Sequence, residues 1–98
     1  MIRHILLIKF KASVTPAQIA QVEALFAAIP EKVDGVVSTE WGINDSPEGR
    51  NEGYTHSVFM TFATEQGRHN YLPHPEHKAL KAEFKPLVEN IIVFDYTV

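Results

Sequence analysis

Cysteine is missing from the chain, which excludes disulfide bonds, thiolate metal sites and a cysteine nucleophile. Long apolar runs are missing too: the run from Ile5 to Ile8 is far shorter than the apolar region of a signal peptide or a membrane span. Basic residues are not in excess, since 9 Lys and Arg stand against 12 Asp and Glu. We therefore expect a cytoplasmic protein that binds neither membranes nor nucleic acid.

Two kinds of functional motif are also absent: there is no glycine-rich phosphate loop and no serine-centred nucleophile elbow. What is present is the composition of an ordinary globular protein, with 45% apolar and 21% charged residues. A chain of 98 residues suffices for one hydrophobic core. The sequence therefore predicts one domain over residues 1–98, stabilised by packing.

The first predicted helix has a complete set of start signals. Thr15 is placed as the N-cap, Pro16 stands at the first helical position, and Gln18 can close a capping box with Thr15. An apolar stripe at helical spacing runs on to Ile29, and Pro30 follows as the expected end.

The remaining pattern alternates strands and helices. Strands are expected at 2–11, 33–44, 54–63 and 90–97, a short helix after the Thr64 cap through Tyr71, and a longer helix at 75–88. The order strand, helix, strand, strand, helix, strand is typical of a ferredoxin-like βαββαβ fold. We therefore expect an α+β protein with a four-stranded antiparallel sheet and helices on one face.

The face of the sheet without helices is expected to be apolar. The side chains assigned to it are Ile5, Leu7, Phe59, Ile91 and Val93. Together they would expose a larger apolar patch than a monomer usually tolerates, so the sequence predicts a homodimer paired through this face. The alternative is a register slip or bulge that turns one strand inward, because register is least secure where both faces are apolar.

Two of the five histidines belong to neighbouring predicted strands. His4 shares a face with Leu6 and Ile8, and His56 shares a face with Val58. If both point toward the helices, the two imidazoles project near one end of the core, between the sheet and the helices. The alternative is a pair of hydrogen-bonded core or rim histidines.

The segment from Tyr71 to His77 is the stronger candidate for catalysis. Pro75 favours the first helical position, which places His74 at or near the N-cap and His77 in the first turn. The positive end of the helix dipole disfavours the imidazolium form there, so His77 would be neutral and able to act as a general base. Tyr71 could donate a hydrogen bond to a carbonyl oxygen. The alternative is a helix entry shaped by proline and nothing more.

The same segment also has residue types that bind metals. His74, Glu76 and His77 are close in sequence, but the further ligands of a zinc site are not identifiable and no two-histidine helical motif of the protease type is present. We therefore expect no metal and no cofactor.

Several segments in order resemble one known family. They are Arg3–Lys11, Glu52–His56, Tyr71 with His74–His77, and Phe94–Tyr96. The chain is similar along nearly its whole length to the stress-responsive dimeric α/β-barrel (Dabb) family. That resemblance implies ferredoxin-like monomers that pair through their sheets into a barrel.

The resemblance also implies a candidate reaction. The family includes a cofactor-free polyketide cyclase that performs an intramolecular aldol condensation. By this similarity Tyr71 and His77 would be the catalytic pair, and His4 and His56 would contact the substrate. The first helix offers Val22, Glu23 and Phe26 where the cyclase has bulky aromatic residues, so a different substrate is expected.

Two functions follow as hypotheses. The first is a cofactor-independent lyase or cyclase acting on a β-dicarbonyl or polyketide-like compound. The second is a non-enzymatic homodimer that serves in a stress response or binds a small apolar ligand, as the resemblance to family members without an assigned reaction implies.

Overall fold

The computed structural model describes residues 1–98 and has the predicted order of elements. The strands are β1 (Ile2–Phe10), β2 (Val36–Ile43), β3 (His56–Phe62) and β4 (Val88–Thr97). The helices are α1 (Pro16–Lys32), α2 (Glu65–Tyr71) and α3 (Pro75–Phe84), and the short 3-10 turn η1 (Lys85–Leu87) leads into β4. The ferredoxin-like βαββαβ prediction is confirmed.

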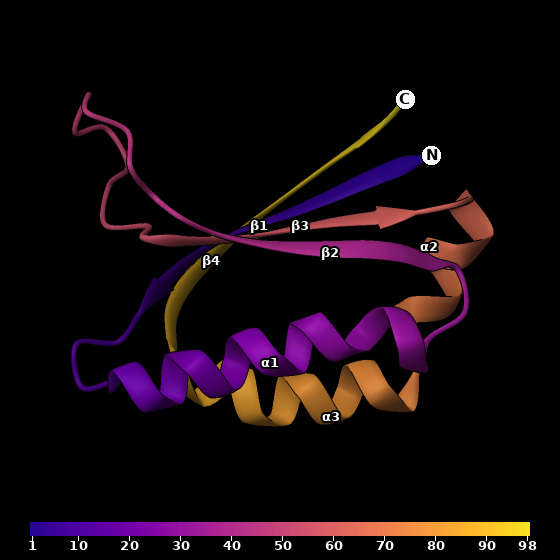
Figure 1. Ribbon diagram of the computed structural model, residues 1–98, viewed down its shortest axis with the longest axis horizontal. Coiled ribbons are helices and arrows are strands. Elements are labelled where there is room, and N and C mark those ends of the chain that lie inside the picture. The colour runs from indigo at the N-terminus through magenta and orange to yellow at the C-terminus, as the bar shows by residue number, and fades with distance from the viewer.

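One antiparallel sheet in the order β2-β3-β1-β4 forms one layer, and α1 and α3 form the other (Figure 1). The core lies between these layers. Its buried residues are Ile2, Leu6, Ile8, Val22, Phe26, Ile29, Val33, Val36, Val58, Met60, Phe62, Tyr71, Leu80 and Phe84. The opposite face of the sheet has no helix over it.

Side-chain caps fix the starts of α1 and α3. Thr15 accepts a hydrogen bond from the Gln18 amide and the Gln18 side chain accepts one from the Thr15 amide, which confirms the capping box. His74 is the N-cap of α3, as predicted, and its Nδ1 accepts a hydrogen bond from the Glu76 amide at 3.0 Å.

The predicted end of α1 at Ile29 is wrong, because the helix continues through Pro30 to Lys32. A proline in a helix leaves the carbonyl four residues earlier without its amide partner. Here that carbonyl belongs to Phe26, and the Thr39 hydroxyl on β2 donates to it at 3.1 Å. The bond from β2 thus satisfies the acceptor that Pro30 leaves free.

The predicted facing of β4 is also wrong. Ile91 pairs with Ile8 and Val93 with Leu6, and residues directly opposite in an antiparallel pair point to the same face. Ile91 and Val93 therefore lie on the helix side. The helix-free face instead carries Ile5, Leu7, Phe59, Ile92, Phe94 and Tyr96.

The helices of the structure are all too short or too polar to cross a membrane. The cytoplasmic location expected from the sequence stays a prediction.

Candidate functional site

A cavity of about 270 Å³ lies between the sheet and α3. It is lined by His4, Leu6, Phe26, Tyr71, Leu72, His77, Leu80, Lys81, Phe84, Lys85, Val88, Ile91 and Val93. Three of the four predicted site residues, His4, Tyr71 and His77, thus share one mainly apolar space. Such a cavity with a few convergent polar groups is the usual form of a small-molecule site.

His56 lies elsewhere. In the register of β1 with β3, His4 is opposite Met60 and His56 is opposite Ile8, so the two histidines are about 13 Å apart along the strands. The expected meeting of His4 and His56 near one end of the core does not occur. The His56 ring instead packs against Phe10, with ring centroids 5.2 Å apart, and its Nδ1 lies 2.7 Å from the Thr55 hydroxyl.

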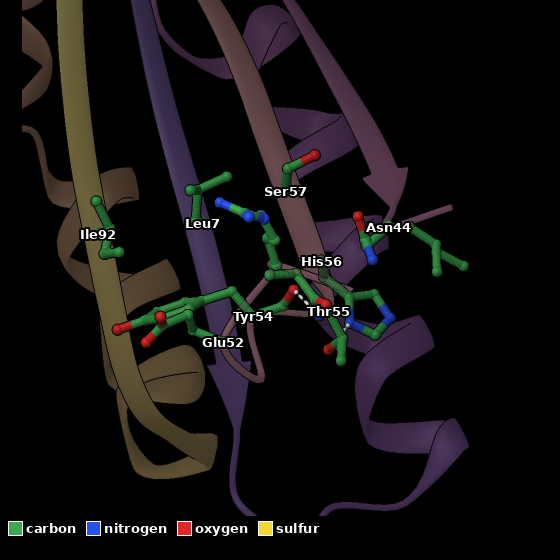
Figure 2. Close-up of a pocket in the computed structure, with 11 residues that line it drawn as sticks. Leu7, Asn44, Glu52, Tyr54, Thr55, His56, Ser57 and Ile92 are labelled. Carbon is green, nitrogen blue, oxygen red and sulfur yellow. Dashed lines mark hydrogen bonds between the residues drawn. The ribbon is translucent and has the colours of Figure 1, made fainter. Parts of the chain in front are cut away.

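His56 lines a second, larger hollow of about 470 Å³ beside the loop between β2 and β3 (Figure 2). Leu7 on β1 and Ile92 on β4 lie side by side at one wall, and Tyr54 comes from the loop. Leu7 and Ile92 belong to the helix-free face, whereas His56 stands opposite Ile8 on the helix side. The hollow therefore lies at the end of the sheet where β3 begins. It contains neither Tyr71 nor His77.

Tyr71 and His77 form a stacked pair across the break between two helices. Tyr71 ends α2 and His77 stands in the first turn of α3, and their ring centroids are 4.1 Å apart with planes inclined by 33°. His77 Nδ1 lies 2.9 Å from the carbonyl oxygen of Leu72. Since a carbonyl only accepts, Nδ1 carries the proton, and a neutral His77 ring keeps a free lone pair on Nε2.

Burial shifts the pKa values of these two residues in opposite directions. It lowers the pKa of His77, against a smaller opposing effect of the bond to the Leu72 carbonyl, and the charge of Lys81 lowers that pKa further. It raises the pKa of Tyr71, whose side chain is 1% exposed, well above its usual value. A neutral imidazole therefore stands beside a phenol that keeps its proton, which is the division of roles that acid–base catalysis needs.

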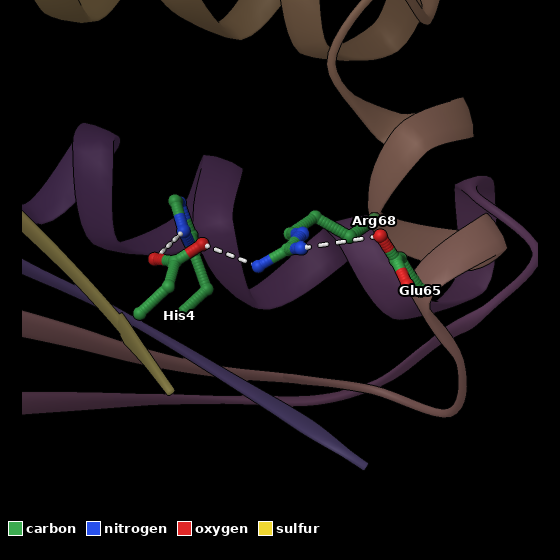
Figure 3. A network of polar contacts seen from close by, with 4 residues as sticks. His4, Glu65 and Arg68 are labelled. Carbon is green, nitrogen blue, oxygen red and sulfur yellow. Dashed lines mark hydrogen bonds and ion pairs between the residues drawn. The ribbon is translucent and has the colours of Figure 1, made fainter. Parts of the chain in front are cut away.

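His4 is held by a chain of charged contacts that ends on α2 (Figure 3). Its Nδ1 lies 2.6 Å from Asp95 Oδ1, and Asp95 Oδ2 lies 3.3 Å from Arg68 Nη1. Glu65 is 4.0 Å from the same guanidinium. Asp95 thus fixes the tautomer and orientation of His4 and leaves Nε2 directed away from the carboxylate.

Asp95 is a site residue that the sequence reasoning missed. The signal that identifies it is the cross-strand pairing of His4 with Asp95, which requires the register of β1 with β4.

The predicted site residues of the cavity have three polar atoms without a partner in the protein: Tyr71 Oη, His4 Nε2 and His77 Nε2. Yet no fully buried side-chain nitrogen or oxygen lacks a hydrogen bond. Each of these three atoms therefore retains some accessible surface. They are available to a molecule in the cavity.

No group of three or more His, Asp or Glu side chains is arranged to hold a metal ion. His74, one of the metal-binding residue types in this segment, uses its Nδ1 to cap α3. The expectation that the site works without a cofactor stays a prediction.

Comparison with known proteins gives relatives that span the whole chain. Olivetolic acid cyclase of Cannabis sativa is 27% identical over 96 residues, which are 98% of this chain and 95% of the cyclase. The structure of a hydroxynitrile lyase from Passiflora edulis matches with a TM-score of 0.92 at 27% identity, covering 99% of this chain and 92% of that one.

A dimeric ferredoxin-like protein of unknown function from Thermobifida fusca matches with a TM-score of 0.84 at 25% identity, covering 99% of this chain and 90% of its own. The family model described as the stress responsive A/B barrel domain matches residues 2–98. By this match over nearly its full length, the chain belongs to the stress-responsive A/B barrel (Dabb) family.

Proposed function

We propose that the cavity carries out cofactor-free acid–base chemistry on a small carbonyl compound, as a lyase or cyclase of the intramolecular aldol type. The observation that supports this most is the stacking of a neutral His77 on a protonated Tyr71 inside an apolar cavity. A β-dicarbonyl or polyketide-like compound is the proposed substrate, because the hydrogen between two carbonyls is acidic enough for an imidazole base.

In the proposed reaction, His77 Nε2 removes a proton from the carbon between two carbonyl groups, and the C–H electron pair becomes an enolate. Tyr71 donates a hydrogen bond to the enolate oxygen and keeps its proton because of its raised pKa. The enolate carbon then attacks a second carbonyl of the same molecule. The new alkoxide takes the proton back from His77, so the protein returns to its starting state.

His4 is proposed to bind the substrate in this scheme. Its Nε2 is free, and its ring is held by Asp95 on the wall of the same cavity. His56 was predicted for the same role, but its place outside this cavity gives it no contact with a substrate held by Tyr71 and His77. We therefore assign substrate contact to His4 alone.

The named relatives are in keeping with this chemistry. One is called a cyclase and the other a hydroxynitrile lyase, and both match the chain over nearly its full length. Two differently named enzymes that share this fold mean that the fold alone does not select the substrate. The choice of reaction for this chain rests on the cavity residues.

The test is turnover of a panel of β-keto thioesters, with cyclised or cleaved products identified by mass spectrometry. His77→Gln should lower turnover by about 10²- to 10⁴-fold, the usual contribution of a general base. Tyr71→Phe should lower it by about 10²-fold or more, as loss of an oxyanion donor does. The matched control is His69→Gln, an exposed histidine on α2 that lines neither cavity.

Equal turnover by the wild-type protein and both variants would refute the catalytic assignment. The second function, binding of a small apolar ligand in a stress response, is favoured by the largely apolar lining of the cavity. In that case the two variants change ligand affinity and no compound of the panel is converted.

The partner proposed for the chain is a second copy. The helix-free face exposes several large apolar side chains, of which Phe94 is 61% exposed. Monomeric proteins rarely leave such a patch uncovered. The description of the Thermobifida fusca relative as dimeric supports the pairing of two copies.

A further inference from the structure

Two lysines line the same cavity as the proposed acid and base. Lys81 lies in the last turn of α3 and Lys85 in η1, directly after it. With His77 they form a series at intervals of four residues, and such residues lie on one face of a helix. One side of the cavity is therefore a stripe of nitrogen-bearing side chains from α3 and η1.

Neither lysine has an acidic partner. Lys81 and Lys85 are in none of the ion pairs of the structure, whereas Lys32 pairs with Glu76. No aspartate or glutamate lines the cavity. This is unusual in a chain with a net charge of −3, where acidic side chains outnumber basic ones.

A favourable interaction with the helix dipole does not explain why Lys81 lies at the cavity wall. A lysine near the C-terminus of a helix interacts favourably with the helix dipole while fully exposed. Lys81 is instead partly buried at the cavity wall, and its charge reaches His77, whose pKa it lowers. The Lys81 ammonium group has no counter-ion within the protein, so an anionic group of a ligand in the cavity can form a charge-assisted contact with it.

We propose that the ligand of this cavity carries an anionic group, a carboxylate or a phosphate, that binds Lys81 and Lys85 while its apolar part lies between Leu6, Phe26 and Phe84. This proposal rests on the cavity of the proposed function and names the substrate class for it. A cavity of about 150 Å³ holds a benzene ring, so the space here admits a ring with a short side chain.

The experiment measures binding by calorimetry at pH 7, without turnover. The probes are 3-phenylpropionate, its uncharged amide 3-phenylpropanamide, and 2-phenylethyl phosphate. The wild-type protein should bind the carboxylate or the phosphate about tenfold more tightly than the amide, as a charge-assisted contact near the surface allows. The tighter of the two anions identifies the natural group.

Lys81→Gln should remove most of this preference while leaving the affinity for the amide within about twofold, and added salt should weaken only the anions. The matched control is Lys78→Gln, because Lys78 is an exposed lysine on the same helix that does not line the cavity. It should keep the wild-type preference.

The proposal is overturned if the amide binds as tightly as the anions, if Lys81→Gln keeps the preference, or if no probe binds at millimolar concentration. Failure of the catalytic assignment is a separate result. An anion preference that depends on Lys81, together with no conversion of any compound of the panel by the wild-type protein, would leave an anion-binding protein without the proposed activity.

Discussion

Gly35 and Gly67 meet backbone to backbone where the chain enters β2 beside α2. A Cβ atom placed on Gly35 would lie 2.9 Å from the Cα of Gly67, and one placed on Gly67 would lie 3.2 Å from the carbonyl oxygen of Gly35. The amide of Ala63 donates to that same carbonyl at 3.0 Å. This contact fixes α2, and with it Tyr71, against the sheet.

Gly35→Ala should lower the free energy of unfolding by about 2–4 kcal/mol, the sum of a strained backbone and overpacking. The reason is that Gly35 combines a φ of +92° with the contact to Gly67. The control is Gly49→Ala: Gly49 has a φ of +68° but nothing within 4 Å of the added Cβ, so a loss of only about 1–2 kcal/mol is expected. Urea unfolding of both variants makes the comparison, and equal losses would show that the contact is unimportant.

Stability should decrease as the pH falls below about 6.5. Burial lowers the pKa of His56 and of His77 in the folded protein from the ordinary value of 6.5. Between that value and the lowered folded pKa values, the unfolded chain binds protons that the folded chain does not, so the free energy of unfolding rises with pH in this window. At pH values above this window, His56 and His77 no longer make the free energy of unfolding depend on pH.

The measurement for this pH effect is urea unfolding at pH 7.5, 6.5 and 5.5. The double variant His56→Gln/His77→Gln should lose less stability between the first and last pH than the wild-type protein does. His69→Gln, at an exposed position, should behave as the wild-type protein. An unchanged pH slope in the double variant would contradict the assignment.

His74→Ala should destabilise the protein by about 1 kcal/mol, because it removes the acceptor for the Glu76 amide at the start of α3. His74→Asn retains a side-chain oxygen at the N-cap and should recover most of that loss. Thermal unfolding of the two variants checks this. If Ala and Asn were equivalent at position 74, the imidazole would have no capping role.

Phe94→Asp should convert the dimer to a monomer, because it places a carboxylate in the middle of the helix-free apolar face. Ala24→Asp adds the same charge to an exposed position on α1, on the other side of the sheet, and should leave the dimer intact. Sedimentation at micromolar concentration gives the masses. A monomeric wild-type protein would refute the paired state itself.

Local signals in the sequence predicted most of the fold. The Thr15 capping box and the His74 cap depend on residues within three positions, so both follow from the local sequence alone. The end of α1 does not, because the bond from Thr39 that satisfies Phe26 comes from another element. The facing of β4 was misassigned because apolar residues occupy both of its faces and alternation alone cannot choose between them.

The candidate site was predictable where it is continuous in sequence. Tyr71 and His77 flank a single helix break, and their pairing follows from that break. Asp95 reaches His4 only through the register of β1 with β4, and the register of β1 with β3 separates His56 from His4. The lysines of the cavity stand at helical spacing from His77, but that spacing shows neither the cavity nor the lack of acidic partners.

The proposed catalytic groups and the proposed pairing surface lie on opposite faces of one sheet. The sheet lies between the cavity and the proposed pairing face, so a partner on that face would not reach the cavity. The two cavities of such a pair would open outward and fill independently. Ligand saturation should therefore follow a simple hyperbola with a Hill coefficient of about one, and a variant that stays monomeric should keep the affinity of the pair.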